Sequence, residues 1–581
     1  MQGAQTCGDL KKDSVSFYCL LLCSVAIVAG GIFYYPKWNQ KDSEATLSWD
    51  VSGYYMYLPA VFIYKDVRHC SFGQKILDKY HPTPDLQQVV PLVNGNVLMK
   101  YTMGEAIIQF PFFALAHCYC LATRQFPADG FSYPYQLGIG LGMLFCSIAG
   151  LYYLRKFLLH YFTDVSVAAC LLCIALASNY LNYAAIDGAM VHNAIFTGYA
   201  VCLYLSARLN KKYRRADLVL FALVSGLILL IRPAEWGVFI LPFFFRRDVL
   251  LRGFRRMALY LSCLATAFVP QVVYTWLVSG RPYVDTYPND GFDWFHPHIW
   301  HCLFSYKAGW WVYSPVMVLC IAGFAFLYQV QHRLFYPSLI FFLVSADICF
   351  SWRVWWYGAS LGQRALIDAY PVLAIPLAAA VQFLFKRVLT RIVFYIFLVS
   401  CITYNLWLTA GSHKNGVIKN GEMNKAYFLA VLGKAEVSDS VLSLLDNEEN
   451  LRKSEKDLAT AVYAGSDSMQ VLNSGNTWSH EYRFLIDNKV GWIRAAVTVK
   501  MGEKEWDIWK MRQLVLKSYS MNSPLKASFI RIDRWIRAGK TGQIFICASV
   551  PSGATDIGIS AWNPGSAQKL WLRLDSIKAG Q

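Results

Sequence analysis

Two aspartates and four basic side chains stand out against the apolar background of this sequence. Asp50 lies in the aromatic segment WDVSGYYMYLPA, and Asp187 lies in the turn IDGAMVHN between two apolar runs. A carboxylate beside a membrane span is costly unless it is paired or faces water. The basic candidates are Lys100, Arg232, Lys307 and Arg364. Snorkelling to lipid headgroups accounts for any one of these cations, but together with two acids they predict a site that binds an anionic headgroup next to a base.

The composition places these residues at a membrane. The chain has 581 residues, of which 56% are hydrophobic and only 16% are charged, with a net charge of +17. Soluble proteins average about 25% charged residues. Charged residues make up roughly 12% of the chain before Gly411 and roughly 24% after it. This shift predicts a membrane domain at 1–411 and a water-soluble domain at 412–581, and it excludes a soluble cytosolic enzyme.

About eleven membrane spans are predicted from apolar runs of suitable length. They are 15–35, 134–154, 165–183, 189–208, 217–232, 235–246, 257–279, 311–330, 334–351, 367–385 and 391–411. The run 235–246 is too short to cross unless it pairs with the preceding span.

Orientation follows from the basic clusters at 155–156, 211–215, 246–256, 332–333 and 386–391, which belong on the cytoplasmic side. Placing all of them there requires 107–121 to lie as a helix on the outer surface. The N-terminus is then cytoplasmic, and the long first loop (36–133), with its membrane-surface helices, lies outside together with the tail.

The tail has alternating stretches at 481–490, 495–500, 527–532 and 542–550, which predict strands. We expect a β-rich domain, either α+β or a β-sandwich. Its tryptophans are interpreted as core residues, with a glycan-binding aromatic surface as the alternative.

The segment 50–66 carries the pattern D-x-x-G-Y-Y-x-Y-L-P-A-x-F-I-Y-x-D. It resembles the first outer loop of bacterial membrane glycosyltransferases of the C-type (GT-C) fold, the RgtA/B/C/D-like relatives of protein O-mannosyltransferases and aminoarabinose transferases. Further similar segments follow in the same order, at 100–104, 187–192, 230–233, 304–315 and 355–368. The resemblance covers residues 15–411 and not the tail.

This resemblance implies transfer of a sugar from a polyprenyl-phosphate donor to a glycan, lipid or protein acceptor, with inversion, at the outer face of a bacterial cytoplasmic (inner) membrane. Asp50 is then the general base and Asp187 a second acid that assists or orients the acceptor. The implied donor-phosphate ligands are Arg232, Lys307, Arg364 and, more weakly, Lys100. The implied acceptor or sugar contacts are Tyr54, Tyr55, His192, Trp356 and Tyr357.

Val51 follows Asp50 where the best-known members have a second acid, which weakens the case for a carboxylate-held metal. No cofactor is expected, although a divalent metal stays open, and three histidines (His296, His298, His301) are a weaker metal candidate. The alternative function is a transporter or flippase of a lipid-linked or anionic solute, which would place polar groups near the membrane midplane. A catalytically inactive assembly protein whose tail does the binding is the third hypothesis.

Overall fold

The structure is a computed structural model of the whole chain, and it describes residues 14–245, 253–287, 290–458, 460–465, 468–503 and 509–581. The basic cluster expected at 246–256 falls partly outside these residues, at 246–252. The chain divides into two compact units, Met1–Lys414 and Asn415–Gln581. Each unit is described by itself.

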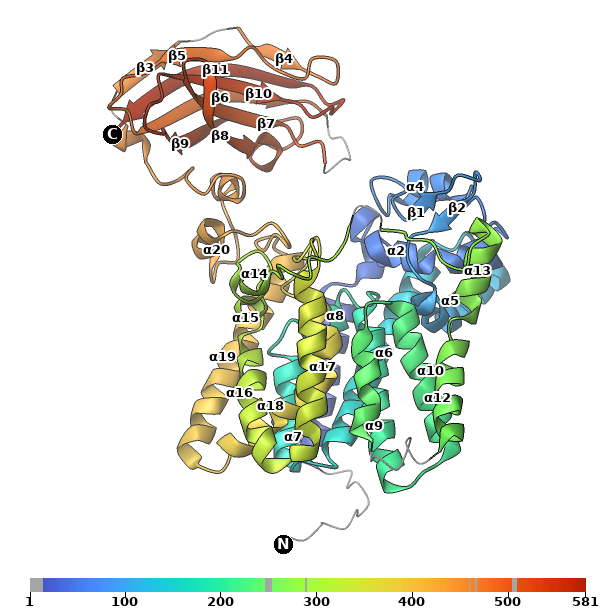
Figure 1. The fold of residues 1–581 in the computed structure, drawn as a ribbon. Coiled ribbons are helices and arrows are strands. Elements are labelled where there is room, and N and C mark those ends of the chain that lie inside the picture. The colour runs from blue at the N-terminus through green and yellow to red at the C-terminus, as the bar shows by residue number, and fades with distance from the viewer. Residues whose placement is uncertain (1–13, 246–252, 288–289, 459, 466–467, 504–508) are drawn as a thin grey trace. The chain divides into compact units, whose positions relative to one another are not determined.

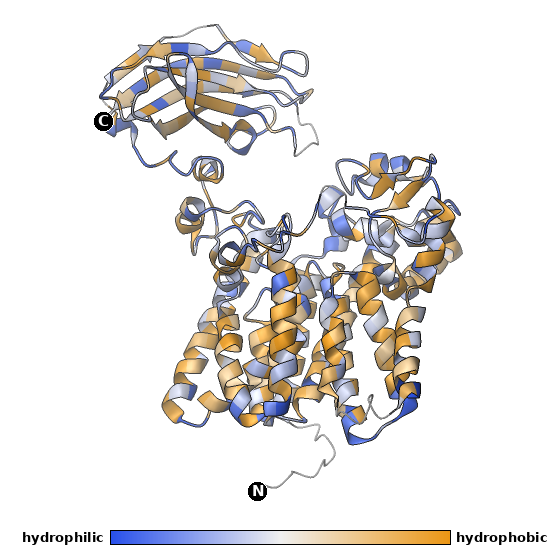
Figure 2. Ribbon diagram, viewed as in Figure 1, coloured by the Kyte–Doolittle hydropathy of each residue, from blue (hydrophilic) through white to orange (hydrophobic). Residues whose placement is uncertain are grey.

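The first unit is a bundle of long helices (Figure 1). These are α1 (Val15–Val28), α5 (Gly104–Thr123), α6 (Tyr133–Leu158), α7 (Asp164–Ala175), α9 (His192–Lys211), α10 (Arg215–Ile231), α12 (Phe254–Thr266), α13 (Val269–Ser279), α16 (Val318–Val330), α17 (His332–Ser351), α18 (Tyr370–Leu384) and α19 (Val388–His413). Figure 2 shows that most of their length is apolar. Helix α18 lies at the centre, where its small residues Ala378, Ala379 and Ala380 are buried and permit close packing of its neighbours.

Six described helices are long and apolar enough to cross a membrane, or seven if the pair α12 and α13, bent by 43°, counts as one span. This count does not confirm the expectation of about eleven spans. Helices α7, α10 and α16 have 12, 17 and 13 residues, and an α-helix needs about 20 to cross at 1.5 Å per residue. The run 235–246 forms a 3₁₀ helix, η4 (Trp236–Phe244), interrupted by Pro242.

Helix α5 coincides with the segment expected on the outer surface, and it passes the same test of length and hydropathy. A surface position for this helix stays a prediction.

Short elements gather at one end of the bundle, the end opposite the first described residues (Figure 1). They are α2 (Trp49–Tyr55), α3 (Tyr57–Phe62), α4 (Gly73–Tyr80), β1 (Val89–Pro91), β2 (Val97–Met99), α8 (Tyr180–Ala185), α14 (Ile299–Phe304), α15 (Trp310–Tyr313) and the 3₁₀ helix η6 (Arg364–Ala369). Several of the predicted site residues lie on these elements.

The second unit is a β-sandwich preceded by the short helices α20 (Lys425–Val431) and α21 (Asp439–Leu442). Its four-stranded sheet has the order β5 (Tyr482–Leu485), β10 (Asp556–Trp562), β7 (Gln513–Ser520) and β8 (Ser523–Arg531). The five-stranded sheet has the order β3 (Thr460–Ala464), β11 (Leu570–Gly580), β6 (Trp492–Met501) and β9 (Thr541–Ser549), with β4 (Gln470–Leu472) also paired to β11.

Alternation along the strands builds the sandwich core. In β6, Ile493, Ala495, Val497 and Val499 are fully buried while the residues between them are not. This two-residue period is what a half-buried strand requires. The β-rich tail predicted from the sequence is confirmed, and each of its four predicted stretches overlaps a strand.

Candidate functional site

Asp50 is held between two side chains that come from distant parts of the chain. Its Oδ1 accepts a 2.8 Å hydrogen bond from the hydroxyl of Tyr101, and its Oδ2 lies 2.8 Å from Nη2 of Arg364. The side chain of Asp50 is still 33% exposed, and that of Arg364 is 19% exposed. The carboxylate is thus paired and yet open to a ligand.

A close approach of α2 to Tyr101 makes this geometry. A Cβ atom added at Gly53 would lie 2.5 Å from the Tyr101 ring, so only glycine fits at that position. On the next residue of α2, the ring of Tyr54 stacks on Tyr101 with centroids 4.3 Å apart. Asp50 itself lies in the first turn of α2, where the helix dipole favours negative charge.

The electrostatics keep Asp50 ionised. Burial raises the pKa of its carboxyl, but the charge of Arg364 and the Tyr101 hydrogen bond outweigh burial, so the pKa lies below its usual value. Burial raises the pKa of Tyr101 well above its usual value, which keeps that hydroxyl a neutral donor. The pair at neutral pH is therefore a carboxylate and a phenol.

Lys100 belongs to the same site. Its charge also lowers the pKa of Asp50. Its Nζ lies 4.7 Å from the ring centroid of Tyr287, which in turn lies 6.4 Å from the Tyr101 ring. Two cations and three tyrosine rings therefore surround one carboxylate, an arrangement suited to a ligand that has both an anionic and an apolar or sugar part.

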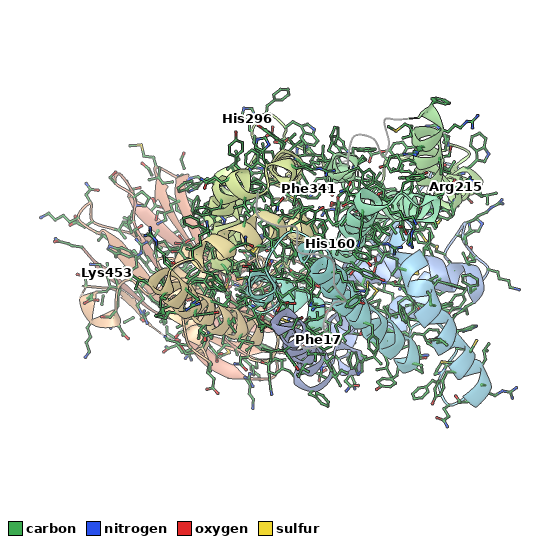
Figure 3. All side chains as sticks on the ribbon, turned by 90° about the horizontal axis from the view of Figure 1, so that it is seen from below. Phe17, His160, Arg215, His296, Phe341 and Lys453 are labelled. Atoms are coloured by element: carbon green, nitrogen blue, oxygen red, sulfur yellow. The ribbon has the colours of Figure 1, made fainter. Side chains whose placement is uncertain are left out.

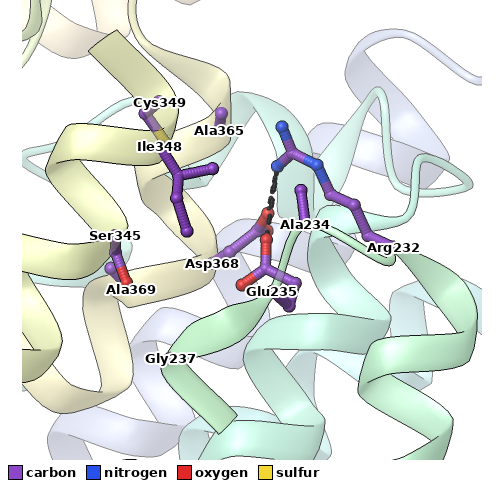
Figure 4. A pocket seen from close by; sticks show the side chains of 10 residues that line it. All are labelled: Arg232, Ala234, Glu235, Gly237, Ser345, Ile348, Cys349, Ala365, Asp368 and Ala369. Carbon is purple, nitrogen blue, oxygen red and sulfur yellow. Dashed lines mark hydrogen bonds and ion pairs between the residues drawn. The ribbon is translucent and has the colours of Figure 1, made fainter. Parts of the chain in front are cut away.

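A second acid–arginine cluster occupies the neighbouring pocket drawn in Figure 4. Nη1 of Arg232 lies 2.8 Å from Oδ2 of Asp368 and 3.4 Å from Oε1 of Glu235. Nδ1 of His192 lies 2.9 Å from the other oxygen of Asp368, and the hydroxyl of Tyr199 donates to Glu235 at 3.0 Å. His192 and Asp368 are almost fully buried.

The two clusters are joined through η6. Arg364 begins this 3₁₀ helix and Asp368 lies four residues later, about 8 Å further along at 2 Å per residue. Arg232 and His192, predicted as phosphate and sugar contacts, are therefore engaged by Asp368 beside the Asp50 site and not in direct contact with Asp50.

Asp187 is tied into a different network. Its carboxylate lies 2.6 Å from Nζ of Lys37, 2.9 Å from Nδ2 of Asn182 and 3.6 Å from Nε2 of His413. Burial raises the pKa of Asp187, but Lys37 and His413 outweigh it and hold that pKa well below its usual range. This arrangement links α8 and the end of α19 to the segment after α1, and the predicted catalytic role of Asp187 stays a prediction.

Four predicted contact residues remain, namely Lys307, Trp356, Tyr357 and Tyr55. Lys307 lies with Nζ 3.6 Å from the Trp356 ring centroid, so these two predicted contacts meet each other. Tyr357 packs beside Arg232, 5.5 Å from ring centroid to guanidinium. Tyr55 is fully buried and donates to the carbonyl of Gly130 at 2.6 Å, which makes it a core residue.

Sequence reasoning did not single out Tyr101, Glu235 or Asp368. Tyr101 and Asp368 fall inside segments that resemble the family, but a tyrosine in an aromatic-rich loop has no distinguishing signal. Asp368 and Glu235 did carry one, because each is an acid in an apolar stretch, the same signal that singled out Asp187.

The weaker metal candidate is not a cluster in this structure. His296 projects from the edge of the helical unit (Figure 3) with its side chain 84% exposed. The rings of His298 and His301 are 6.3 Å apart. Among the described residues, no group of three or more His, Cys, Asp and Glu side chains is arranged to hold a metal ion.

Comparison with known proteins gives a resemblance among solved structures alone. No protein-family profile matches the chain, and no curated protein matches it. Among solved structures, it is similar to the arabinosyltransferase EmbB from Mycobacterium smegmatis, with a TM-score of 0.37 and 10% sequence identity. The alignment covers 100% of this chain and 66% of EmbB. At this TM-score the resemblance does not identify a function.

Proposed function

We propose that the protein is a membrane glycosyltransferase that moves a sugar from a polyprenyl-phosphate donor to a hydroxyl of a glycan, lipid or protein acceptor. The observation that carries this proposal is the ionised, partly open carboxylate of Asp50 with Arg364 and Lys100 beside it. A charged base and a phosphate-binding cation are the two groups that such a transfer needs.

In the proposed reaction, the acceptor oxygen attacks the anomeric carbon as the bond from that carbon to the phosphate oxygen breaks. The acceptor proton passes to Asp50, and the electron pair of the broken bond leaves with the polyprenyl phosphate. Arg364 and Lys100 stabilise the negative charge of that leaving group. Direct displacement of this kind inverts the anomeric configuration.

Arg364 has two anionic partners in this scheme, one at a time. In the structure it is paired with Asp50, and a carboxylate held in this way is a weak base. A donor phosphate that draws Arg364 away leaves burial as the main influence on Asp50 and raises its basicity. Donor binding thus prepares the base for the acceptor.

The distribution of charged groups supports transfer over transport. A transporter places its polar site near the membrane midplane. Here the Asp50 and Asp368 clusters belong to short elements at one end of the bundle, and the middles of the long described helices are largely apolar (Figure 2). A flippase or transporter remains the alternative function.

We further propose the setting in which this reaction occurs. The protein is a multi-pass protein of a bacterial inner membrane, with its N-terminus in the cytoplasm and with the Asp50 site and the second unit on the outer side. The basic clusters at 155–156, 211–215 and 386–391 support this orientation.

The test compares envelope glycans and lipids by mass spectrometry in a deletion strain complemented with the wild type, Asp50→Asn or Asp85→Asn. Asp85 is an acid of the same loop that takes no part in the site, so it is the matched control. We expect Asp50→Asn to insert normally and to leave the deletion profile uncorrected, while Asp85→Asn restores it. A wild-type profile with Asp50→Asn would contradict the proposal.

A further inference from the structure

The outward face of the four-stranded sheet carries an aromatic surface. Strand β10 points Ile557, Ile559 and Ala561 into the sandwich core. Because neighbouring residues of a strand point to opposite faces, Ser560 and Trp562 point away from that core. Trp478, just before β5, is the cross-strand partner of Trp562. We call these two tryptophans the indole pair.

The indole pair forms a partly exposed aromatic stack. The two ring systems lie 5.9 Å apart between centroids, with 25° between their planes. Trp478 is 46% exposed. A large aromatic group exposed to water is unfavourable, and exposed tryptophans are enriched at binding surfaces.

Polar side chains lie beside the indole pair and contact one another. Lys517 lies with Nζ 5.1 Å from the Trp478 ring centroid and 3.7 Å from Oε1 of Glu481. Glu481 also accepts hydrogen bonds from Tyr519 at 2.6 Å and from Arg483 at 3.1 Å. Glu481 lies directly over Gly558, where an added Cβ would approach its carboxyl carbon to 2.7 Å.

The charges of this network are balanced. Lys517 and Arg483 are matched by Glu481 and by Asp556, whose carboxylate lies 3.8 Å from Arg483. An acidic polysaccharide, a nucleic acid or an anionic lipid would require an excess of positive charge here. The charge balance therefore favours a neutral ligand with many hydroxyl groups.

Ser560 adds an unused polar group on the same face. It is 2% exposed, and its hydroxyl has no hydrogen-bond partner among the described residues. A buried hydroxyl without a partner costs about 1–3 kcal/mol, which a ligand or a bound water would recover. Ser560 lies two residues before Trp562 and therefore on the same face of β10.

We propose that this face binds a neutral, pyranose-containing glycan. The apolar face of a sugar ring packs on the indole pair, and the sugar hydroxyls bond to Glu481, Arg483 and Lys517. This inference goes beyond the proposed function, because it concerns the second unit and does not depend on whether the first unit transfers a sugar. It also assigns Trp478 and Trp562 to a surface role, whereas core packing was the interpretation favoured from the sequence.

The opposite sheet supplies a matched control. On the outward face of the five-stranded sheet, Trp571 pairs with Lys500 at 5.2 Å, almost the same distance as Trp478 to Lys517. There, however, Trp571 has no second indole beside it among the described residues. Asp575 on that face is already bonded to Thr498, Gln543 and Arg573.

The experiment uses the full-length protein in detergent on a printed array of neutral and acidic oligosaccharides, followed by calorimetric titration with the best-bound neutral oligosaccharide. We expect Trp478→Ala to weaken binding at least about tenfold, as the loss of an aromatic anchor does, and Trp571→Ala to leave it unchanged. Thermal unfolding of both variants checks the fold.

Three outcomes would overturn the proposal. The first is binding to no neutral pyranose glycan on the array. The second is an equal loss with Trp478→Ala and Trp571→Ala. The third is binding to acidic glycans alone, lost with Lys517→Ala and kept with Trp478→Ala, which would mean that charge and not stacking holds the ligand. If Trp478→Ala fails to fold, Trp562→Ala and Trp478→Phe repeat the comparison.

Discussion

At the scale of single residues, the site is defined by the aspartate with which each of two arginines pairs. Arg364 holds Asp50 and Arg232 holds Asp368. The sequence allowed Asp50, Arg364 and Arg232 to be singled out by residue type and by the resemblance of their segments. The pairing itself spans 314 positions in the case of Arg364, and no local pattern predicts such a contact. Asp187 was expected to act with Asp50, but its pairing with Lys37 depends on tertiary packing.

The pairing of Arg364 with Asp50 predicts a change in pH dependence. Activity requires the carboxylate, so it falls as the pH drops through the lowered pKa of Asp50. Arg364→Gln removes the strongest influence that lowers this pKa and leaves burial, which raises it. We therefore expect the acid limb of the pH–rate profile to move to higher pH, together with weaker use of the donor.

Values of kcat/KM for the donor, which report the free enzyme, test this expectation when measured between pH 3 and pH 8. Arg353→Gln, an arginine of the preceding loop, is the control. An acid limb at the wild-type position in Arg364→Gln would remove the arginine from the site.

At the scale of elements, the alternation of residues predicted the strands, whereas hydropathy did not predict where the helices are interrupted. Alternation located the strands of the second unit, because one face of each strand packs in the core. Fewer described helices pass the length test than spans were predicted, because apolar runs such as 165–183 and 311–330 contain breaks. The first is split between α7 and α8, and Pro315 begins a 3₁₀ turn in the second. Hydropathy alone does not register such breaks.

The close approach of α2 to Tyr101 gives an element-level prediction. Gly53→Ala would insert a methyl group 2.5 Å from the Tyr101 ring, and overpacking of this kind typically costs about 1–3 kcal/mol. We expect α2 and Tyr101 to move apart, the hydrogen bond to Asp50 to weaken, and transfer activity to fall at least about tenfold.

Gly253→Ala is the control for Gly53→Ala, because a Cβ at Gly253 meets nothing within 4 Å. Transfer rates and thermal unfolding are measured for both variants. Wild-type activity in Gly53→Ala would show that the spacing between α2 and Tyr101 is unimportant.

At the scale of the whole molecule, composition separated the two units. The rise in charged residues after Gly411 lies close to the end of α19 at His413, and the structural division follows Lys414. Charge composition is set by contact with lipid or water, so it can be read without knowing the fold. Which face of the sandwich is exposed could not be read in this way, because Trp478 and the buried tryptophan Trp535 look alike in the sequence.

The proposed orientation gives the prediction at this scale. Alkaline phosphatase fused after Gln581 folds only outside the cytoplasm, so we expect it to be active, while green fluorescent protein at the same position stays dark. Fusions at the basic loop 211–215 should give the reverse pattern. A fluorescent fusion after Gln581 would overturn the orientation and with it the outer location of the Asp50 site.

The short 3₁₀ helix η6 carries both Arg364 and Asp368, so the two acid–arginine pairs share one support. Asp368 in turn contacts His192 at the start of α9 and Arg232 after α10. If a ligand that draws Arg364 toward itself also shifted η6, the contacts of Asp368 with these two helix ends would shift with it.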